Sequence, residues 1–409
     1  MPNAANLRPR DDNALAARDL AAYRLLDASR LFTPALLVYP DFVGSNVRTV
    51  IQLLDGNPAR WRAHVKSAKL SYVVKQLTAA GVTALKCATT LELRVACECG
   101  AADVLLAYPL VGPKIERVKQ LALQHPEVEV SALVENPLAV AAWRGSKVGL
   151  FVDVNPGMDR TGIRESDVNE IVATAQAVQE AGLRFGGIHY YDGHILPLSG
   201  ETVEATAHRG YDRLMSLVSE VEAAGVHVPE VITAGTPGLP FTLSYPAFGR
   251  LAPNTGGGAS PRLVHRASPG TIVYNDATSA GQLPAAWDLR PAAIVAATVV
   301  SHPAPGLVTC DAGHKTVSAD AGVPTCVVLG RPNLQPLKPS EEHLPIAVTP
   351  GSPLPEIGEI LYLVPRHVCP TVNNFDEAVI VRGGRIEGVE RVTARGHEAP
   401  LIEAPGSGL

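Results

Sequence analysis

Two short segments carry side chains that could do covalent or metal chemistry, and the first contains Lys66. This lysine stands at the carboxyl end of a strand-like run that begins at Arg62, among mostly apolar neighbours. Catalytic groups gather at that end of the strands in parallel α/β proteins. Desolvation there favours the uncharged amine, which is a nucleophile. The alternative is a solvated surface lysine, the usual state of this residue type.

The second segment is PRHVCPT, which contains His367 and Cys369. If it is extended, residues at i and i+2 lie on the same face, so an imidazole and a thiolate could share one metal ion. That donor pair suits zinc. Because structural zinc normally takes four protein ligands, two ligands would leave positions open to water or substrate, as in a catalytic site. The alternative is a packed cysteine beside a hydrogen-bonded histidine.

Two turns of small residues could bind a phosphate group. Gly235 and Thr236 follow a strand in the segment TAGTPG, and Gly270, Thr271 and Tyr274 lie in the segment PGTIVYND. Backbone N–H groups and hydroxyls exposed in such turns can donate hydrogen bonds to an anion. An ordinary turn is the alternative for each segment.

Further polar side chains follow two other strands. The segment HYYDGH at residues 189–194 includes Tyr191 and His194, and the segment DRTG includes Arg160. These groups can hold an aromatic ring, move protons or supply a fixed cation. Each alone is more often structural, but the carboxyl ends of the strands of a barrel converge on one mouth. The set therefore predicts one site at that mouth.

The elements that would position these residues alternate between short apolar runs and longer amphipathic stretches. This alternation predicts repeated βα units and a mostly parallel sheet. Strands are expected to begin near residues 35, 62, 83, 103, 128, 148, 184 and 229, with helices at 71–81, 89–100, 166–182 and 201–225. About eight units over about 240 residues favour a (β/α)8 TIM-like barrel in an α/β protein, and a doubly wound open sheet is the alternative.

The pattern changes after about residue 280. The apolar runs become short and β-branched, are interrupted by Pro and Gly, and have no long helical stretch between them. We therefore expect a C-terminal all-β domain with the metal site at residues 281–409, behind a barrel at residues 33–280. Residues 1–32 are expected to be an N-terminal extension that packs on the β domain.

Composition excludes several classes of protein. The 409 residues include 35 Lys and Arg against 40 Asp and Glu, without a basic cluster, so no electrostatic footprint for nucleic acid is present. A hydrophobic content of 46% with 18% charged residues argues against disorder. No apolar run approaches the roughly 18 residues of a membrane span, and the amino terminus lacks an apolar signal segment. We expect a cytoplasmic protein with reduced cysteines, no membrane association and no nucleic-acid partner.

The order of the motifs is more specific than any one of them. The chain contains, in order, HVK, CATTLE, VDVNPGMDRTG, GIHYYDGH, TAGTP, PGTIVYND, DAGHK, SEEH and HVCPTVNNFDE. In this it resembles the D-serine dehydratase and D-threonine aldolase family, pyridoxal-phosphate enzymes of the alanine-racemase-like fold type III. The resemblance covers about residues 33–395. It implies a barrel that carries the cofactor, a C-terminal β domain and a homodimer, with the strand at residue 35 outside the barrel and a further strand near residue 271.

The resemblance also implies roles for single residues. Lys66 and His194 would be the catalytic residues, Lys66 as the lysine that binds the cofactor covalently and His194 on the substrate side. Arg160 matches an arginine near the phenolic oxygen of the cofactor, and Tyr191 a tyrosine near its pyridine ring. The expected phosphate contacts are Gly235, Thr236, Gly270, Thr271 and Tyr274. The expected ligands of a divalent metal, zinc first and manganese or magnesium as alternatives, are His367 and Cys369.

The implied activity is that of a lyase acting on a small D-amino acid. A His-x-Cys pair resembles the dehydratase branch, because aldolases of the family typically carry Asp in place of the Cys. Lys66 would remove the α-proton of a D-3-hydroxy amino acid, and loss of the β-hydroxyl would give a 2-oxo acid and ammonia. The alternatives are a D-threonine aldolase that yields glycine and an aldehyde, an amino-acid racemase, and a non-catalytic pyridoxal-phosphate carrier.

Overall fold

The computed structural model describes residues 12–193, 202–253 and 263–400 of the chain. The chain divides into two compact units, each made of separate stretches of sequence. Unit 1 consists of residues 1–49, 67–73 and 271–395, and unit 2 of residues 50–66, 74–270 and 396–409. The predicted domain boundaries at residues 32 and 280 follow chain order and stay a prediction.

Unit 2 is built around eight parallel strands in the hydrogen-bonded order β10-β9-β8-β6-β5-β4-β3-β2. A parallel bridge between Trp61 and Ala267 joins the two ends of this order, so the sheet closes on itself as a barrel. The strands are β2 (Ala63–His64), β3 (Ala84–Cys87), β4 (Asp103–Pro109), β5 (Glu129–Val134), β6 (Gly149–Asn155), β8 (Phe185–Tyr190), β9 (Glu230–Thr233) and β10 (Val264–Ala267), with the short β7 (Ile163–Arg164) beside β6.

The strands of the barrel were expected from their apolar runs, and all but one begin where the sequence predicts. The strand expected at residue 35, β1 (Ala35–Val38), lies in the other sheet, as the resemblance implied. The strand that completes the barrel, β10, ends a few residues before the expected position near residue 271. Its sequence, VHRA, mixes polar and apolar residues and therefore gives a weak strand signal.

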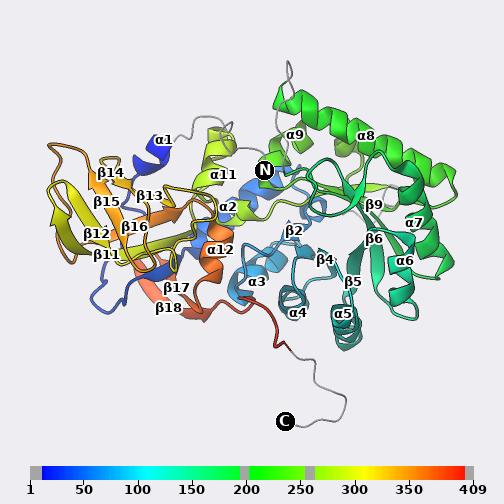
Figure 1. Ribbon diagram of the computed structural model, residues 1–409, viewed down its shortest axis with the longest axis horizontal. Helices are drawn as coiled ribbons and strands as arrows, with labels where there is room; N and C mark the ends of the chain where they lie inside the picture. Colours follow the sequence, from blue (N-terminus) through cyan, green and yellow to red (C-terminus); the bar gives the residue numbers. More distant parts are fainter. Residues whose placement is uncertain (1–11, 194–201, 254–262, 401–409) are drawn as a thin grey trace, which may run out of the picture. The chain divides into compact units, whose positions relative to one another are not determined.

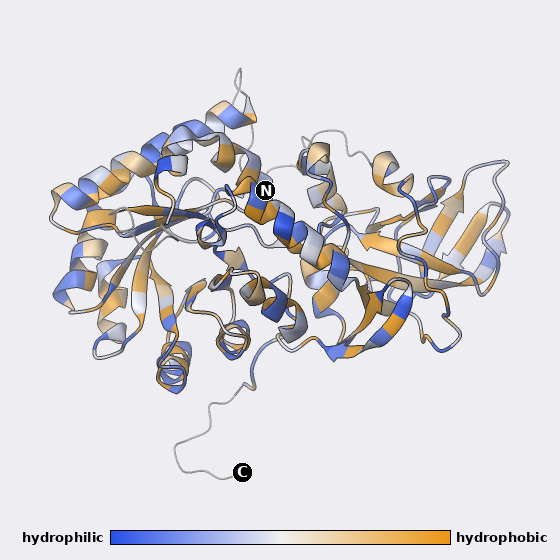
Figure 2. Ribbon diagram, turned by 180° about the vertical axis from the view of Figure 1, so that it is seen from behind, coloured by the Kyte–Doolittle hydropathy of each residue, from blue (hydrophilic) through white to orange (hydrophobic). Residues whose placement is uncertain are grey.

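Helices cover the outer side of the barrel (Figure 1). Their apolar faces pack on the strands, and Figure 2 shows hydrophilic and hydrophobic residues alternating along the long α8, as expected of an amphipathic helix. The helices of unit 2 are α4 (Thr90–Glu98), α5 (Pro113–Gln124), α6 (Pro137–Val140), α7 (Val168–Glu180), α8 (Val203–Ala223), α9 (Leu239–Ser244) and α10 (Pro246–Arg250), with the 3-10 turns η2 (Pro58–Arg60), η3 (Ala141–Trp143) and η4 (Thr236–Gly238).

Local signals explain where α4 begins. Thr89 Oγ1 accepts a hydrogen bond from Glu92 N at 3.1 Å, and Glu92 Oε2 accepts one from Ala88 N at 2.7 Å. The Thr-x-x-Glu spacing of the sequence predicts the first of these bonds, whereas the glutamate bonds to the residue before the N-cap, Ala88.

A buried ionic network lies at the amino-terminal ends of the barrel strands. The Arg62 guanidinium is 0% exposed and donates to Glu230 at 2.9 Å and to Asp103 at 2.9 Å. Arg266 also pairs with Glu230. Burying these charges is tolerable because each has a partner and several hydrogen bonds.

Unit 1 contains a second sheet in the order β14-β15-β12-β11-β1-β17-β18, with β16 joining β11 to β13. All its pairs are antiparallel except β1 with β17. The further strands are β11 (Ala293–Ala304), β12 (Leu307–Cys310), β13 (Cys326–Val328), β14 (Leu334–Pro336), β15 (Leu344–Val348), β16 (Ile360–Pro365), β17 (Glu377–Arg382) and β18 (Arg385–Arg391).

Short helices accompany this second sheet. They are α1 (Asp12–Ala16), α11 (Ala277–Gln282) and α12 (Val368–Asn373), with the 3-10 turns η5 (Thr271–Val273) and η6 (Ala285–Trp287). The unit boundaries fall inside α2 (Pro40–Leu53) and α3 (Ser71–Ala79). The predicted fold class, a TIM-like barrel together with a mostly antiparallel β region near the carboxyl terminus, is confirmed.

None of the helices in the described ranges has both the length and the apolar character that crossing a bilayer requires.

Candidate active site

Lys66 lies just beyond the carboxyl end of β2, at the mouth of the barrel. Its side chain is half-buried, and within the described residues its Nζ takes part in no hydrogen bond or ion pair. An amine held at a barrel mouth without such a partner is available to react with an aldehyde.

A second lysine, which the sequence analysis did not single out, lies inside the barrel on β3. Lys86 is 2% exposed, and its Nζ lies 3.5 Å from His189 Nε2. Burial and the positive charge of Lys66 lower the pKa of Lys86 to about 7, although Asp192 and Asp153 favour its charged form. One feature of the sequence could have identified Lys86: it is a lysine in the middle of the apolar strand TALKCA, where burying a charge is costly.

His189 is held between this lysine and a carboxylate. Its Nδ1 lies 2.7 Å from Asp153 Oδ1, and Asp153 Oδ2 accepts a hydrogen bond from Thr161 Oγ1 at 2.9 Å. Burial lowers the pKa of His189, and the hydrogen bond to Asp153 opposes that shift without cancelling it. The neutral ring therefore donates from Nδ1 to Asp153 and presents the Nε2 lone pair to Lys86.

Three of the predicted site residues come together around an aromatic ring. The Arg160 guanidinium carbon lies 4.9 Å from the centre of the Tyr191 ring, and Lys86 Nζ lies 5.7 Å from it. A Cβ at Gly235 would lie 3.0 Å from the same ring, so the glycine lets the turn approach it closely. Arg160, Tyr191 and His189 also line a small pocket in unit 2.

The turn at Gly235 and Thr236 already contains a buried carboxylate. Gly235 N donates to Asp192 Oδ1 at 3.3 Å, and Tyr211 Oη donates to Asp192 Oδ2 at 2.5 Å. Burial raises the pKa of Asp192, although these hydrogen bonds favour its charged form. One backbone donor of this turn, Gly235 N, is therefore already engaged. The phosphate contacts predicted for the turn stay a prediction.

The second predicted phosphate turn begins at Gly270, directly after β10. A Cβ at Gly270 would lie 2.4 Å from His64 O, so only glycine allows the turn to pass this close to β2. In unit 1, Tyr274 Oη donates to Ala68 O at 2.9 Å, and Thr271 Oγ1 lies 3.4 Å from Ser67 Oγ. The phosphate roles of these residues stay predictions as well.

The extended conformation predicted for the segment of His367 and Cys369 is wrong. Cys369 lies in the first turn of α12, and His367 is the extended residue that precedes this helix. Asp276 Oδ2 accepts from Val368 N at 2.9 Å and so satisfies one of the first N–H groups of this helix. Asp276 is distant in sequence, so the local pattern does not reveal this cap.

The two side chains nevertheless interact. Burial disfavours protonation of His367, but hydrogen bonds with Cys369 and with Asp320 outweigh burial and raise its pKa to about 9. Within the described ranges, no three His, Cys, Asp or Glu side chains are arranged to hold a metal ion. The predicted role of His367 and Cys369 as metal ligands stays a prediction.

The remaining predicted catalytic residue, His194, lies outside the described residues.

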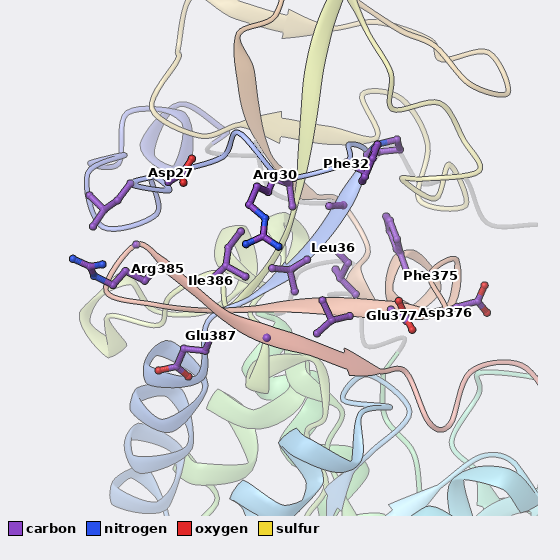
Figure 3. A pocket seen from close by; sticks show the side chains of 18 residues that line it. Asp27, Arg30, Phe32, Leu36, Phe375, Asp376, Glu377, Arg385, Ile386 and Glu387 are labelled. Carbon is purple, nitrogen blue, oxygen red and sulfur yellow. The ribbon is translucent and has the colours of Figure 1, made fainter.

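A separate groove in unit 1 is lined by residues from two segments, 26–36 and 375–389, though not by every residue of either (Figure 3). Figure 3 shows charged side chains such as Arg30 and Glu387 beside apolar ones such as Phe32 and Ile386. None of the predicted site residues lines it, so it offers no role to the candidate chemistry.

The sequence matches models of two protein families. Residues 40–247, just over half of the chain, match the family "Alanine racemase, N-terminal domain". Residues 292–381 match the family "Putative serine dehydratase domain".

Characterised relatives match along nearly their whole length. The D-threonine aldolase of Arthrobacter sp is 26% identical over 90% of this chain and 94% of the relative. The 3-hydroxy-D-aspartate aldolase of Paracoccus denitrificans (strain Pd 1222) is 28% identical over 92% of this chain and 96% of the relative. The D-threo-3-hydroxyaspartate dehydratase of Delftia sp. (strain HT23) is 25% identical over 84% and 93%.

A solved structure has the same architecture. The crystal structure of the D-threonine aldolase from Filomicrobium marinum superposes with a TM-score of 0.77 at 29% identity, covering 89% of this chain and 96% of that one. These comparisons confirm the prediction that the protein is a lyase related to the D-serine dehydratases and D-threonine aldolases. Given the barrel, the lysine at its mouth and the extent of the family match, the chain belongs to the alanine-racemase-like family of fold type III pyridoxal-phosphate enzymes.

Proposed function

We propose that this protein is a pyridoxal-phosphate-dependent lyase of D-3-hydroxy amino acids and that its principal reaction is dehydration to a 2-oxo acid and ammonia. The observation that carries the proposal is the position of Lys66, an amine without a hydrogen-bond partner among the described residues at the carboxyl end of a barrel strand. Relatives that act on D-threonine and 3-hydroxy-D-aspartate support the substrate class.

The residues of the barrel mouth fit the cofactor. Lys66 supplies the amine that an aldehyde needs, and Tyr191 supplies an aromatic face with the Arg160 cation 4.9 Å from its centre. When bound, pyridoxal phosphate withdraws electrons from the bond that breaks at the substrate α-carbon.

The side chains of unit 2 would handle the proton. The free amine of Lys66 would be the base that removes the α-proton of the substrate. His189 stays fixed by Asp153 at 2.7 Å, and Lys86, whose pKa lies near 7, donates to the other side of that ring.

The pair in unit 1 fits a divalent cation. An imidazole nitrogen and a thiolate sulfur are both ligands that zinc accepts in proteins. His367 and Cys369 already lie close enough for a hydrogen bond. We propose that they hold zinc, since manganese and magnesium prefer oxygen ligands. The ion would supply a Lewis acid that weakens the bond to the departing β-hydroxyl.

Aldol cleavage is the second candidate, and the relatives are the observation in its favour. The D-threonine aldolase and the 3-hydroxy-D-aspartate aldolase match over 90% and 92% of this chain. In that reaction the bond between the α- and β-carbons breaks, and the products are glycine and an aldehyde.

A product assay separates the two reactions. The holoenzyme is supplied with D-serine, D-threonine and D-3-hydroxyaspartate, and the 2-oxo acid, ammonia and glycine are quantified. A 2-oxo acid with an equal amount of ammonia supports dehydration. Glycine without ammonia supports aldol cleavage, which from D-3-hydroxyaspartate also yields glyoxylate, itself a 2-oxo acid. Turnover of none of the three substrates would contradict the substrate class.

Replacing the proposed covalent lysine tests the cofactor assignment. We expect Lys66→Ala to abolish the absorbance of covalently bound cofactor and to lower turnover by roughly 10³-fold or more, because the nucleophile and the proposed base are lost together. The measurement is an absorbance spectrum of the purified variant with a steady-state assay. Lys75→Ala, an exposed lysine on α3, is the control and should behave like the wild type. A Lys66→Ala variant with a normal spectrum and rate would end the proposal.

A further inference from the structure

His367 belongs to a closed cycle of hydrogen bonds, which it enters through both its side chain and its backbone carbonyl. Asp320 Oδ2 lies 2.6 Å from His367 Nδ1, and Ser318 Oγ donates to Asp320 Oδ1 at 2.8 Å. Ser318 N donates to Thr371 Oγ1 at 3.2 Å, and Thr371 Oγ1 donates to His367 O at 2.9 Å. The cycle fixes the loop that carries Asp320 to the helix that carries Cys369.

This arrangement decides which nitrogen of His367 carries the hydrogen. A carboxylate only accepts hydrogen bonds, so the nitrogen that faces Asp320, Nδ1, is the donor. In the neutral ring Nε2 then has the free lone pair, which is the form that ligates a metal. Metal-binding histidines typically donate their other N–H to a carboxylate, which fixes the tautomer and the ring orientation and makes the ligand more basic.

The thiol has a polar neighbour of its own. Ser67 is 0% exposed, and its Oγ lies 2.9 Å from Cys369 Sγ. A hydroxyl that contacts the sulfur at this distance from a buried position restricts the rotamer of Cys369 and so fixes where its sulfur lies. Ser67 directly follows Lys66 in the chain.

Asp320 is not simply one half of a surface ion pair. The His367 and Asp320 side chains are 37% and 48% exposed, and an isolated pair with that exposure would contribute little. Here both carboxylate oxygens accept hydrogen bonds, one from His367 and one from Ser318. The carboxylate is therefore held in one orientation, which is what a group that orients a metal ligand requires.

We propose that Asp320 and Ser67 are positioning residues for a divalent cation, Asp320 by directing His367 Nε2 and Ser67 by holding the Cys369 sulfur in place through its buried hydroxyl. This inference rests on the proposed metal role of the His367 and Cys369 pair.

The affinity of the full-length holoenzyme for zinc tests the inference without an activity assay. The protein is freed of metal with a chelator, and zinc is titrated in competition with a chromophoric chelator. Asp320→Ala should weaken zinc binding by roughly 10- to 100-fold, the usual effect of losing such a partner. Asp320→Asn should weaken it less, because its amide oxygen still accepts from Nδ1. Ser67→Ala should lower both the affinity and the intensity of the thiolate-to-cobalt absorbance when cobalt replaces zinc.

The control is another exposed acid of unit 1. Asp376 pairs with Arg395 at 2.9 Å, and Asp376→Ala should bind zinc like the wild type. If His367→Ala and Cys369→Ala lose zinc while Asp320→Ala, Asp320→Asn and Ser67→Ala all keep wild-type affinity, the inference is wrong and the metal pair stands. If His367→Ala and Cys369→Ala also keep it, the metal role itself is wrong, and the inference falls with it.

Discussion

At the scale of single residues, folding controls the charge of Lys86. Its pKa is about 7 in the folded protein, against about 10.4 for a lysine in an unfolded chain. Between these pH values the unfolded chain binds one more proton than the folded protein. Stability therefore rises as the pH increases from about 7 to about 10 and is lost as the pH falls through that window.

Replacing this lysine with methionine removes that contribution. We predict that the difference in unfolding free energy between Lys86→Met and the wild type favours the variant most at pH 7 and declines steadily towards pH 9.5. Urea unfolding of the cofactor-free proteins at several pH values measures it. Lys75→Met, on an exposed position of α3, should show a difference that does not depend on pH. A constant difference for Lys86→Met as well would mean that Lys86 is charged in the folded protein.

The site could be predicted from the sequence only where the chemistry is local. Lys66 ends a recognisable strand, so its place at the barrel mouth follows from a few neighbouring residues. Asp320 lies 47 residues from its partner His367 in the chain, and no local pattern connects the two. The helix that carries Cys369 is capped in the same way from a distance, by Asp276, 92 residues before Val368 in the chain.

At the scale of elements, β8 and β9 approach each other closely at Gly187. This residue has a φ of +130°, and a Cβ there would lie 1.9 Å from Glu230 O. We predict that Gly187→Ala destabilises the protein by roughly 3 kcal/mol or more, through backbone strain and a clash that no rotamer relieves. Thermal and urea unfolding measure the change.

A glycine with open surroundings provides the comparison. No atom lies within 4 Å of a Cβ built at Gly281, in α11. Gly281→Ala should therefore leave stability unchanged or raise it by up to about 1 kcal/mol. Equal effects of the two substitutions would show that the approach of β8 to β9 is less constrained than the geometry indicates.

The elements that the sequence predicted well are those with uniform apolar runs. The strands β5 and β6 are almost wholly buried, and the centre of β4 is buried as well, so their composition reveals them. The strand β10 was placed only approximately because its central residues, His265 and Arg266, are polar. Their partners, Thr233 and Glu230, lie on another strand, so the neighbouring residues in the sequence do not indicate them.

At the scale of the whole molecule, the barrel has two ends with different tasks. The candidate site residues follow the carboxyl ends of the strands, while Arg62, Asp103 and Glu230 form an ionic network at the amino-terminal ends. In barrels of this kind the first end carries function and the second carries stability.

Removing the central cation of that network tests this division. Arg62→Met should cost roughly 3–5 kcal/mol of unfolding free energy, because Asp103 and Glu230 would keep buried charges with fewer partners. The cofactor absorbance of the folded variant should stay normal. Glu129→Ala, which removes an exposed pair with Arg184 and leaves the other hydrogen bonds of Arg184 in place, should cost less than about 1 kcal/mol. Equal losses in urea unfolding would contradict a structural role for the network.

The way the chain is shared between the two units could not be read from the sequence. Composition changes near residue 280, yet unit 1 also takes residues 1–49 and 67–73. These pieces join it through pairings between residues far apart in the chain, which leave no local mark. The homodimer and the cytoplasmic location stay predictions.

The pairing of β1 has a consequence for synthesis on the ribosome. Ala35 pairs with Ala296 on β11, and Leu37 pairs with Val379 on β17. At roughly 5–20 residues per second, β1 must wait on the order of ten seconds to a minute before either neighbour has been translated. A nascent chain that pauses in this interval exposes an apolar segment, ALLV, with nothing yet made to pair with it.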